Sequence, residues 1–200
     1  EIKKLSKKFI KHNNSFCICG TGGSSLGAQA LFGLLSKQKS KNFHFYDNID
    51  PLSFANNLNH HNFSKTGFII VSKSGFTTET LGQLGAILKK IEDLKLTSNI
   101  SKHFIILTEK KNSPLTYIAK NFKIPLLFHN KNIGGRFSVF SNVALLPAFL
   151  AGIDIDEIKK GAKSILKELI KDNYNESYNG AALSIAMHKK YNANINVMLT

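Results

Sequence analysis

Apolar residues follow two periods along this chain, one typical of buried strands and one of amphipathic helices. Five short apolar runs bounded by polar or glycine-rich segments predict buried strands. Between them, apolar residues recur at spacings of three and four, which predicts helices. The predicted strands are residues 16–20, 43–47, 67–75 (running into a polar loop), 103–110 and 124–129; the predicted helices are residues 25–37, 51–60, 77–94, 113–122, 138–150, 154–171 and 177–190. A basic amphipathic segment precedes them, and a strand-like run, residues 194–199, follows.

Strands that alternate with helices predict an α/β fold, a doubly wound and mainly parallel five-stranded sheet with helices on both faces. In such sheets, the loops at the carboxyl ends of the strands carry the ligand site. The sequence contains no internal repeat and no low-complexity linker. A single domain is therefore the simplest account.

The net charge and the distribution of lysines indicate which classes of partner the chain can bind. The chain has 27 basic and 13 acidic residues, with a formal net charge of +14, and the lysines are spread along its whole length. Nucleic-acid binders gather arginine and lysine on one face with interleaved aromatic residues, so we expect a lysine-rich solvated surface and no nucleic-acid partner. Such a surface still favours anionic small molecules. No apolar run is long enough to span a membrane, so we expect none.

Cysteine and histidine usage adds two expectations. Cys17 and Cys19, two residues apart in a predicted strand, are too few and too close for a disulfide framework, which favours a reducing, cytoplasmic compartment. The seven histidines show no metal-ligand spacing, and the oxygen-rich loops lack clustered carboxylates. We expect the histidines to be surface or core residues, and we expect no metal site.

A glycine-rich loop, residues 20–27, follows the first predicted strand. Glycines let backbone amides approach an anionic or polyhydroxylated ligand, and the next helix directs its N-terminus to the same place. The loop also nearly matches the dinucleotide fingerprint G-x-G-x-x-G, with Ser25 in place of the third glycine and Asp47 near the position of a ribose-binding acid. A nicotinamide-binding domain therefore remains an alternative, as does a glycine turn required only for packing.

The loop after the third predicted strand, residues 72–80, combines several hydroxyl groups and one lysine in front of a helix. Hydroxyls, backbone amides and the helix dipole together suit a terminal phosphate monoester. The alternative is ordinary helix capping by serine and threonine. Capping accounts for one hydroxyl but not for several beside a lysine, which favours the anion site.

Arg136, the only arginine of the chain, lies behind Gly134 and Gly135 after the fifth predicted strand. In a chain that otherwise uses lysine, this choice suggests a need for a planar, permanently charged group. Such a group can stabilise a developing oxyanion. The alternative is an arginine in a surface turn.

Together these loops resemble the glucose-6-phosphate isomerase family, whose core belongs to the sugar isomerase (SIS) superfamily. The similarity lies in GTGGSSLG (20–27), SKSGFTTET (72–80) and GGRFSVFS (134–141), in the family's order, and spans about residues 15–200. The last two segments together are specific, since other SIS proteins share the serine/threonine loop but not the arginine segment. Ser74 replaces the more usual threonine, and Gly75 stands where an aromatic residue is common.

The resemblance implies a role for each matching residue. The hexose end of the pocket would be lined by Gly23 and Ser24, and Arg136 would stabilise an enediolate. Glu79 matches an acidic residue that, in the family, partners a histidine from the other subunit of a homodimer. The 6-phosphate would be held by Ser72, Ser74 and Thr77, with Lys73 in the same loop.

The implied reaction interconverts glucose 6-phosphate and fructose 6-phosphate without a cofactor, in glycolysis and gluconeogenesis. The family's base glutamate and ring-opening histidine would lie beyond Thr200, so we expect this piece alone to be inactive. The implied organisation is an N-terminal helical remnant (1–14), a SIS-type sugar-phosphate-binding domain (15–150) and a segment leading into a second SIS domain (151–200). A non-catalytic SIS module that senses sugar phosphates, or a nicotinamide-binding domain, remains the alternative.

Overall fold

A computed structural model describes residues 1–36, 42–171, 176–195 and 197. In this part of the chain the five predicted strands form one parallel sheet with the order β2-β1-β3-β4-β5. The predicted doubly wound α/β fold is confirmed. The strands are β1 (Ser15–Cys19), β2 (Phe43–Tyr46), β3 (Thr66–Val71), β4 (Phe104–Glu109) and β5 (Leu126–His129).

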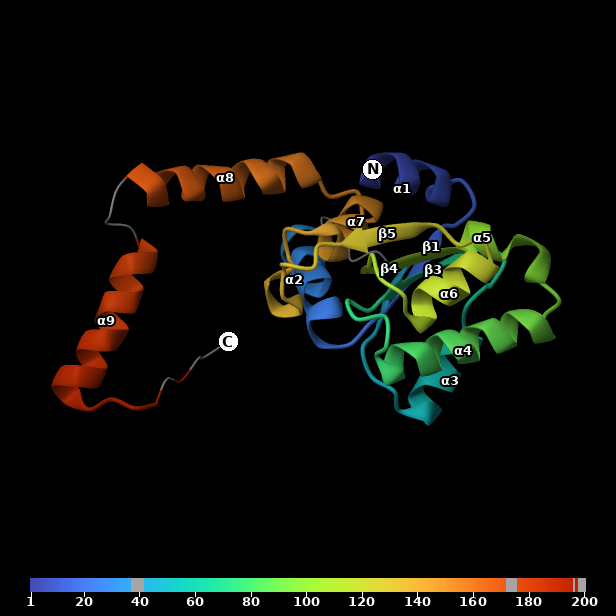
Figure 1. The fold of residues 1–200 in the computed structure, drawn as a ribbon, viewed down its shortest axis with the longest axis horizontal. Helices are drawn as coiled ribbons and strands as arrows, with labels where there is room; N and C mark the ends of the chain where they lie inside the picture. Colours follow the sequence, from blue (N-terminus) through green and yellow to red (C-terminus); the bar gives the residue numbers. More distant parts are fainter. Residues whose placement is uncertain (37–41, 172–175, 196, 198–200) are drawn as a thin grey trace. The chain divides into compact units, whose positions relative to one another are not determined.

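Helices cover both faces of the sheet (Figure 1). One face carries α1 (Ile2–Ile10), α2 (Leu26–Leu35) and α7 (Asn142–Leu150), which pack on one another. The other face carries α3 (Pro51–Asn59), α4 (Thr78–Asp93), α5 (Ile100–His103) and α6 (Pro114–Asn121). Short 3-10 turns are η1 (Gly22–Ser24), η2 (Thr97–Asn99) and η3 (Gly135–Phe137), and the last helices are α8 (Ile155–Lys171) and α9 (Glu176–Tyr191).

The central strands are apolar on both faces, as expected for a parallel sheet that is covered on both sides. In β3, for example, Phe68 and Ile70 pack into the cluster beneath α3–α6, whereas Ile69 alternates to the opposite face. All three side chains are completely buried. The continuous apolar runs that predicted these strands are thus explained by burial on two sides.

Strand order decides where a ligand site can form. From β1 the chain passes to β2 on one side, and then returns to β3 on the other side of β1. The loops after β1 and β3 therefore leave the sheet in divergent directions, and a crevice forms between them at the carboxyl edge. Cys19 lies opposite Ile70 in the register of these two strands. The glycine loop (residues 20–27) and the hydroxyl loop (residues 72–80) therefore begin side by side.

Some predicted boundaries were wrong. The helix predicted over residues 138–150 begins at Asn142, because Ser141 caps it by accepting a hydrogen bond from Val143 N (3.3 Å) and the residues between η3 and Ser141 form a turn. Ser113 caps α6 with a full capping box, and Pro114 is its first residue. The strand predicted at residues 194–199 falls partly outside the described residues, and those described there form no strand.

The chain divides into two compact units, Glu1–Ile155 and Asp156–Thr200. The first contains the whole sheet and all three predicted ligand loops. In the second, α8 has acidic residues in its first turn, which suits the helix dipole, and α9 ends with basic residues. Among the described helices, we find none that is both long enough and apolar enough to cross a membrane.

A polar cluster interrupts the core beneath α3. The Tyr46 hydroxyl is hydrogen-bonded to His61 Nε2, and Cys17 Sγ lies 3.4 Å from the same nitrogen. The His44 ring packs edge-on against His61, with 4.5 Å between ring centroids. Burial, together with the nearby His44 and His60, lowers the pKa of His61 to about 4. The imidazole of His61 is therefore neutral at pH 7.

We expect the melting temperature to fall as pH is lowered from 7 towards 4.5. In the unfolded chain His61 binds a proton near its ordinary pKa of 6.5, whereas in the folded chain it does so only near 4. Stability from the neutral imidazole is thus fully present above about pH 6.5 and lost progressively below it. Thermal unfolding followed by circular dichroism should give a shallower pH dependence for His61→Gln. His188→Gln, on α9, is the matched control, and equal slopes for the two variants would contradict this assignment.

Candidate active site

Hydroxyl groups converge in the loop that leaves β3. Ser72 Oγ lies 2.7 Å from Thr77 Oγ1 and 3.5 Å from Ser74 Oγ, and it accepts a hydrogen bond from Gly75 N (3.1 Å). Thr77 directly precedes α4, yet its side chain makes no capping hydrogen bond. Capping therefore does not account for this hydroxyl. The loop places three hydroxyls together in front of the N-terminus of a 16-residue helix, an arrangement that suits an anion.

The connection from β4 to α6 fixes the shape of this hydroxyl loop. Gly75 has a φ of 72°, in the left-handed region that favours glycine. A Cβ at this position would overlap Ser113 Oγ and lie 3.0 Å from Thr108 Oγ1. The loop also begins with a hydrogen bond from Ser72 N to Leu107 O (3.1 Å). The hydroxyl loop is therefore docked on its neighbour and is not a free surface turn.

Lys73 extends away from the hydroxyls beside it. Its ammonium donates to Lys131 O (3.0 Å) and lies 3.5 Å from Glu109 Oε1. Within the described residues, it makes no hydrogen bond to Ser72, Ser74 or Thr77. Lys73 belongs to the loop that was predicted to bind phosphate, but its charge is held towards β4 and the segment after β5.

Backbone contacts join the glycine loop to both other loops. A Cβ on Gly20 would lie 2.9 Å from Val71 O, so this glycine permits close approach to the end of β3. Gly23 packs against Gly135: a Cβ on Gly23 would overlap the Gly135 carbonyl and lie 2.8 Å from Arg136 N. Ser138 Oγ reinforces this contact by donating to Gly23 O (3.1 Å). Because β5 is the sheet edge opposite β2, the segment after β5 must cross the carboxyl edge to reach η1.

Arg136 lies on η3, and the contact between Gly23 and Gly135 holds η3 against the glycine loop. Its side chain is exposed and makes no hydrogen bond or ion pair with the residues that the structure describes. The main chain of Arg136 is thus held next to the glycine loop, while its guanidinium remains able to bind an anionic group. Ser24, also on η1, is partly buried next to Gly20.

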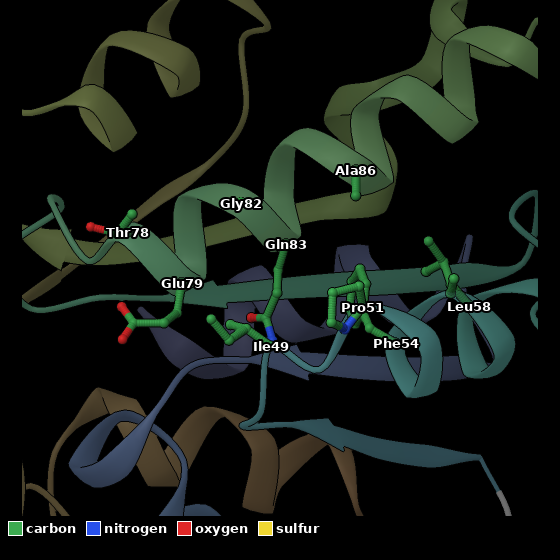
Figure 2. Close-up of a pocket in the computed structure, with 10 residues that line it drawn as sticks. Ile49, Pro51, Phe54, Leu58, Thr78, Glu79, Gly82, Gln83 and Ala86 are labelled. Carbon is green, nitrogen blue, oxygen red and sulfur yellow. The ribbon is translucent and has the colours of Figure 1, made fainter.

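Glu79, in the first turn of α4, lines a cavity of about 540 Å³ between α3 and α4 (Figure 2). Figure 2 shows Gln83, one turn later, extending from α4 towards Ile49 and Pro51 at the start of α3. Gln83 Nε2 donates to Tyr46 O (3.2 Å) and Asn48 O (2.9 Å), which ties α4 to the end of β2. Thr78 and Glu79 are the residues that this cavity shares with the loop of residues 72–80, and no residue of the glycine loop lines it.

The dinucleotide alternative fits the structure poorly. Ser25, at the position of the third glycine, is completely buried, and its Oγ accepts a hydrogen bond from Gln29 (2.7 Å). The same amide donates to the Asp47 carboxylate (2.9 Å). The acid that would bind a ribose is therefore already engaged by a side chain of α2.

Several residues around the hydroxyl loop were missed in the sequence. Glu109 and Lys131 hold Lys73, and Ser113 packs against Gly75. Thr80 Oγ1, in the first turn of α4, is buried without a hydrogen-bond partner among the described residues. Only Ser113 had a recognisable signal, as a helix cap, because contacts between distant segments leave no local pattern.

The model of the family described as phosphoglucose isomerase matches residues 5–199 of this chain. A glucose-6-phosphate isomerase of Carboxydothermus hydrogenoformans is 32% identical over 94% of this chain and 42% of its own length. One from Campylobacter jejuni is 31% identical, over 97% of this chain and 46% of its own length. The chain thus spans less than half the length of these relatives.

Solved structures show the same similarity. A hypothetical protein of Thermus thermophilus superposes with a TM-score of 0.75 at 31% identity, over 82% of this chain and 39% of its own. A glucose-6-phosphate isomerase of Chlamydia trachomatis superposes with a TM-score of 0.62 at 27% identity, over 74% of this chain and 29% of its own. This chain therefore shares its arrangement of strands and helices with these two proteins.

Proposed function

The chain belongs to the phosphoglucose isomerase family, and on this premise we propose that it forms the sugar-phosphate-binding part of a glucose-6-phosphate isomerase. The enzyme interconverts glucose 6-phosphate and fructose 6-phosphate by moving a proton between C1 and C2 of the open-chain sugar. The observation that carries the proposal is the convergence of Ser72, Ser74 and Thr77 hydroxyls before α4, joined through the glycine loop to the segment of Arg136.

The hydroxyl loop binds the 6-phosphate. Three hydroxyls can each donate to a phosphoryl oxygen, and the N-terminus of α4 adds N–H groups and a favourable dipole. Lys73 contributes positive charge from the edge of the loop. Gly23 and Ser24 line the sugar end, where the absence of a side chain at Gly23 lets the segment of Arg136 approach the glycine loop.

Arg136 stabilises the enediolate that forms when the C2 proton is removed. Negative charge then develops on the oxygens of C1 and C2, and a guanidinium that faces them favours that state more than the neutral sugar. The base that takes the proton is a glutamate, and a histidine opens the ring; both are expected outside this chain. Such a base contributes about 10²–10⁴-fold to the rate.

We further propose that the enzyme is a cytoplasmic homodimer. Glu79 lines the cavity between α3 and α4, where it can pair with a histidine supplied by the second subunit. Residues 15–150 form the sugar-phosphate-binding domain, residues 1–14 a helical remnant, and residues 151–200 lead into a second SIS domain. Buried free thiols at Cys17 and Cys19 suit a reducing compartment.

The test is a coupled assay of fructose 6-phosphate conversion by the intact protein. Ser72→Ala should raise KM for fructose 6-phosphate at least about tenfold, the effect of losing one hydrogen bond to a charged group. Ser98→Ala, in η2, is the matched control and should leave KM unchanged. Binding of fructose 6-phosphate without turnover would favour a non-catalytic sensor, and binding of NAD(H) would favour the nicotinamide alternative; either result contradicts the proposal.

A further inference from the structure

The carboxylate of Glu109, at the end of β4, joins two lysines. Its Oε1 lies 3.5 Å from Lys73 Nζ, and its Oε2 lies 3.0 Å from Lys111 Nζ. The hydrogen bond from Lys111, with a smaller contribution from Lys73, lowers the pKa of Glu109 below its usual value. The side chain is only 16% exposed. An ionised and largely enclosed carboxylate thus neutralises the one lysine of the hydroxyl loop.

The backbone of Lys73 is held by the same end of β4. Glu109 N donates to Lys73 O (3.1 Å), and Thr108 Oγ1 donates to the same oxygen (3.3 Å). The ammonium is held in addition by Lys131 O (3.0 Å). Both the main chain and the side chain of Lys73 are therefore held by residues outside the hydroxyl loop.

These contacts set the direction of the side chain. Ser72 Oγ and Ser74 Oγ lie 3.5 Å apart, so they share one side of the loop, whereas Lys73 between them reaches towards Glu109 and Lys131. A flexible ammonium next to three hydroxyls would otherwise be free to bind a phosphate dianion directly. Glu109 competes with the ligand for that ammonium, and its own charge opposes a dianion.

We propose that Glu109 is a positioning residue that holds Lys73 out of the hydroxyl loop and thereby weakens the binding of the phosphate dianion. The inference rests on the proposed function of this loop and goes further, because it concerns how tightly the site holds its ligand. Hydroxyls and amides bind the phosphoryl group, while Lys73 acts from a distance. A reversible isomerase benefits, since its substrate and product carry the same phosphate and must both be released.

The test measures the Kd of the intact protein for inorganic phosphate and for glucose 6-phosphate by calorimetry. Glu109→Gln keeps the backbone N–H and removes the charge. At low salt this variant should lower the Kd for inorganic phosphate and the Kd for glucose 6-phosphate at least about threefold each, a size that the loss of one ion pair allows. Because the cause is electrostatic, the gain should shrink at high salt. KM for fructose 6-phosphate should fall with it, whereas kcat should not rise.

A double-mutant cycle separates this role from a simple charge effect. In the Lys73→Met background, Glu109→Gln should no longer tighten binding. Glu92→Gln, on the exposed side of α4, removes the same charge from an ion pair with Lys89 and should leave Kd unchanged. Tightening that persists without Lys73, equal tightening by Glu92→Gln, or weaker binding in Glu109→Gln would each overturn the proposal.

Two further variants keep the result interpretable. Glu109→Ala should tighten binding in the same direction, and thermal unfolding should show that both variants at position 109 are folded. Ser72→Ala tests the hydroxyl loop itself. If Ser72→Ala weakens phosphate binding and Glu109→Gln changes nothing, only the role of Glu109 fails. If Ser72→Ala leaves binding unchanged, the phosphate site is elsewhere and the proposed function fails as well.

Discussion

Replacing Arg136 with lysine is expected to lower kcat about 10²–10³-fold while KM for fructose 6-phosphate changes little. Lysine keeps the positive charge but loses the planar fork that can face two oxygens of the enediolate at once. Because this charge develops only as the proton leaves C1 of fructose 6-phosphate, the loss falls on the chemical step. The measurement is steady-state kinetics of the intact protein in the coupled assay.

Lys120→Met is the control for Arg136→Met. It removes one exposed cation from α6, and we expect it to leave kcat unchanged. Arg136→Met should lower kcat at least as much as Arg136→Lys does. Added guanidinium should restore part of the activity of Arg136→Met. An unchanged kcat with a raised KM in Arg136→Lys would assign this residue to substrate binding and would remove its proposed role in the reaction.

Gly23→Ala should have the second largest effect, a fall in kcat/KM of about 10²-fold. The added methyl group would overlap the main chain of Gly135 and lie 2.8 Å from Arg136 N, so η1 and η3 must separate. Neither neighbour is a flexible side chain that can move aside, and Arg136 moves with η3. We also expect about 1–3 kcal/mol of destabilisation, measured by denaturant unfolding.

Gly135→Ala is the matched control from the other side of the same contact. A Cβ at this position meets only Gly23 Cα, at 3.8 Å, which is an ordinary distance. It should therefore retain nearly full activity and stability. If the two variants behave alike, the contact between Gly23 and Gly135 does not position Arg136, and this part of the site has been misread.

The sequence predicted the elements because their signals are local. The apolar run of residues 67–71 reveals β3 by itself, and Ser113 followed by Pro114 marks the start of α6. The clustering of three loops was predicted from a general property of parallel sheets, since every carboxyl end lies at one edge. The start of α7 was misplaced because the pattern of residues 138–150 does not reveal that its first four residues form a turn and the Ser141 cap.

The orientation of side chains within the site could not be predicted in this way. Nothing between residues 72 and 80 indicates that Lys73 pairs with Glu109, which comes from another strand. Likewise, the need for glycine at position 23 depends on Gly135, more than a hundred residues away. Only the fold brings these partners together. Motifs therefore predicted which residues form the site, and the structure added the contacts that hold those residues.

The contact between η1 and η3 is made almost wholly by main-chain atoms. Substitutions in the surrounding side chains can accumulate over evolution without displacing it, as long as Gly23 is kept. A change in length is different. Deleting or inserting one residue between β5 and η3 would put another residue opposite Gly23 and would shift Arg136 from its position beside the glycine loop. This connection should therefore tolerate point substitutions far better than insertions or deletions.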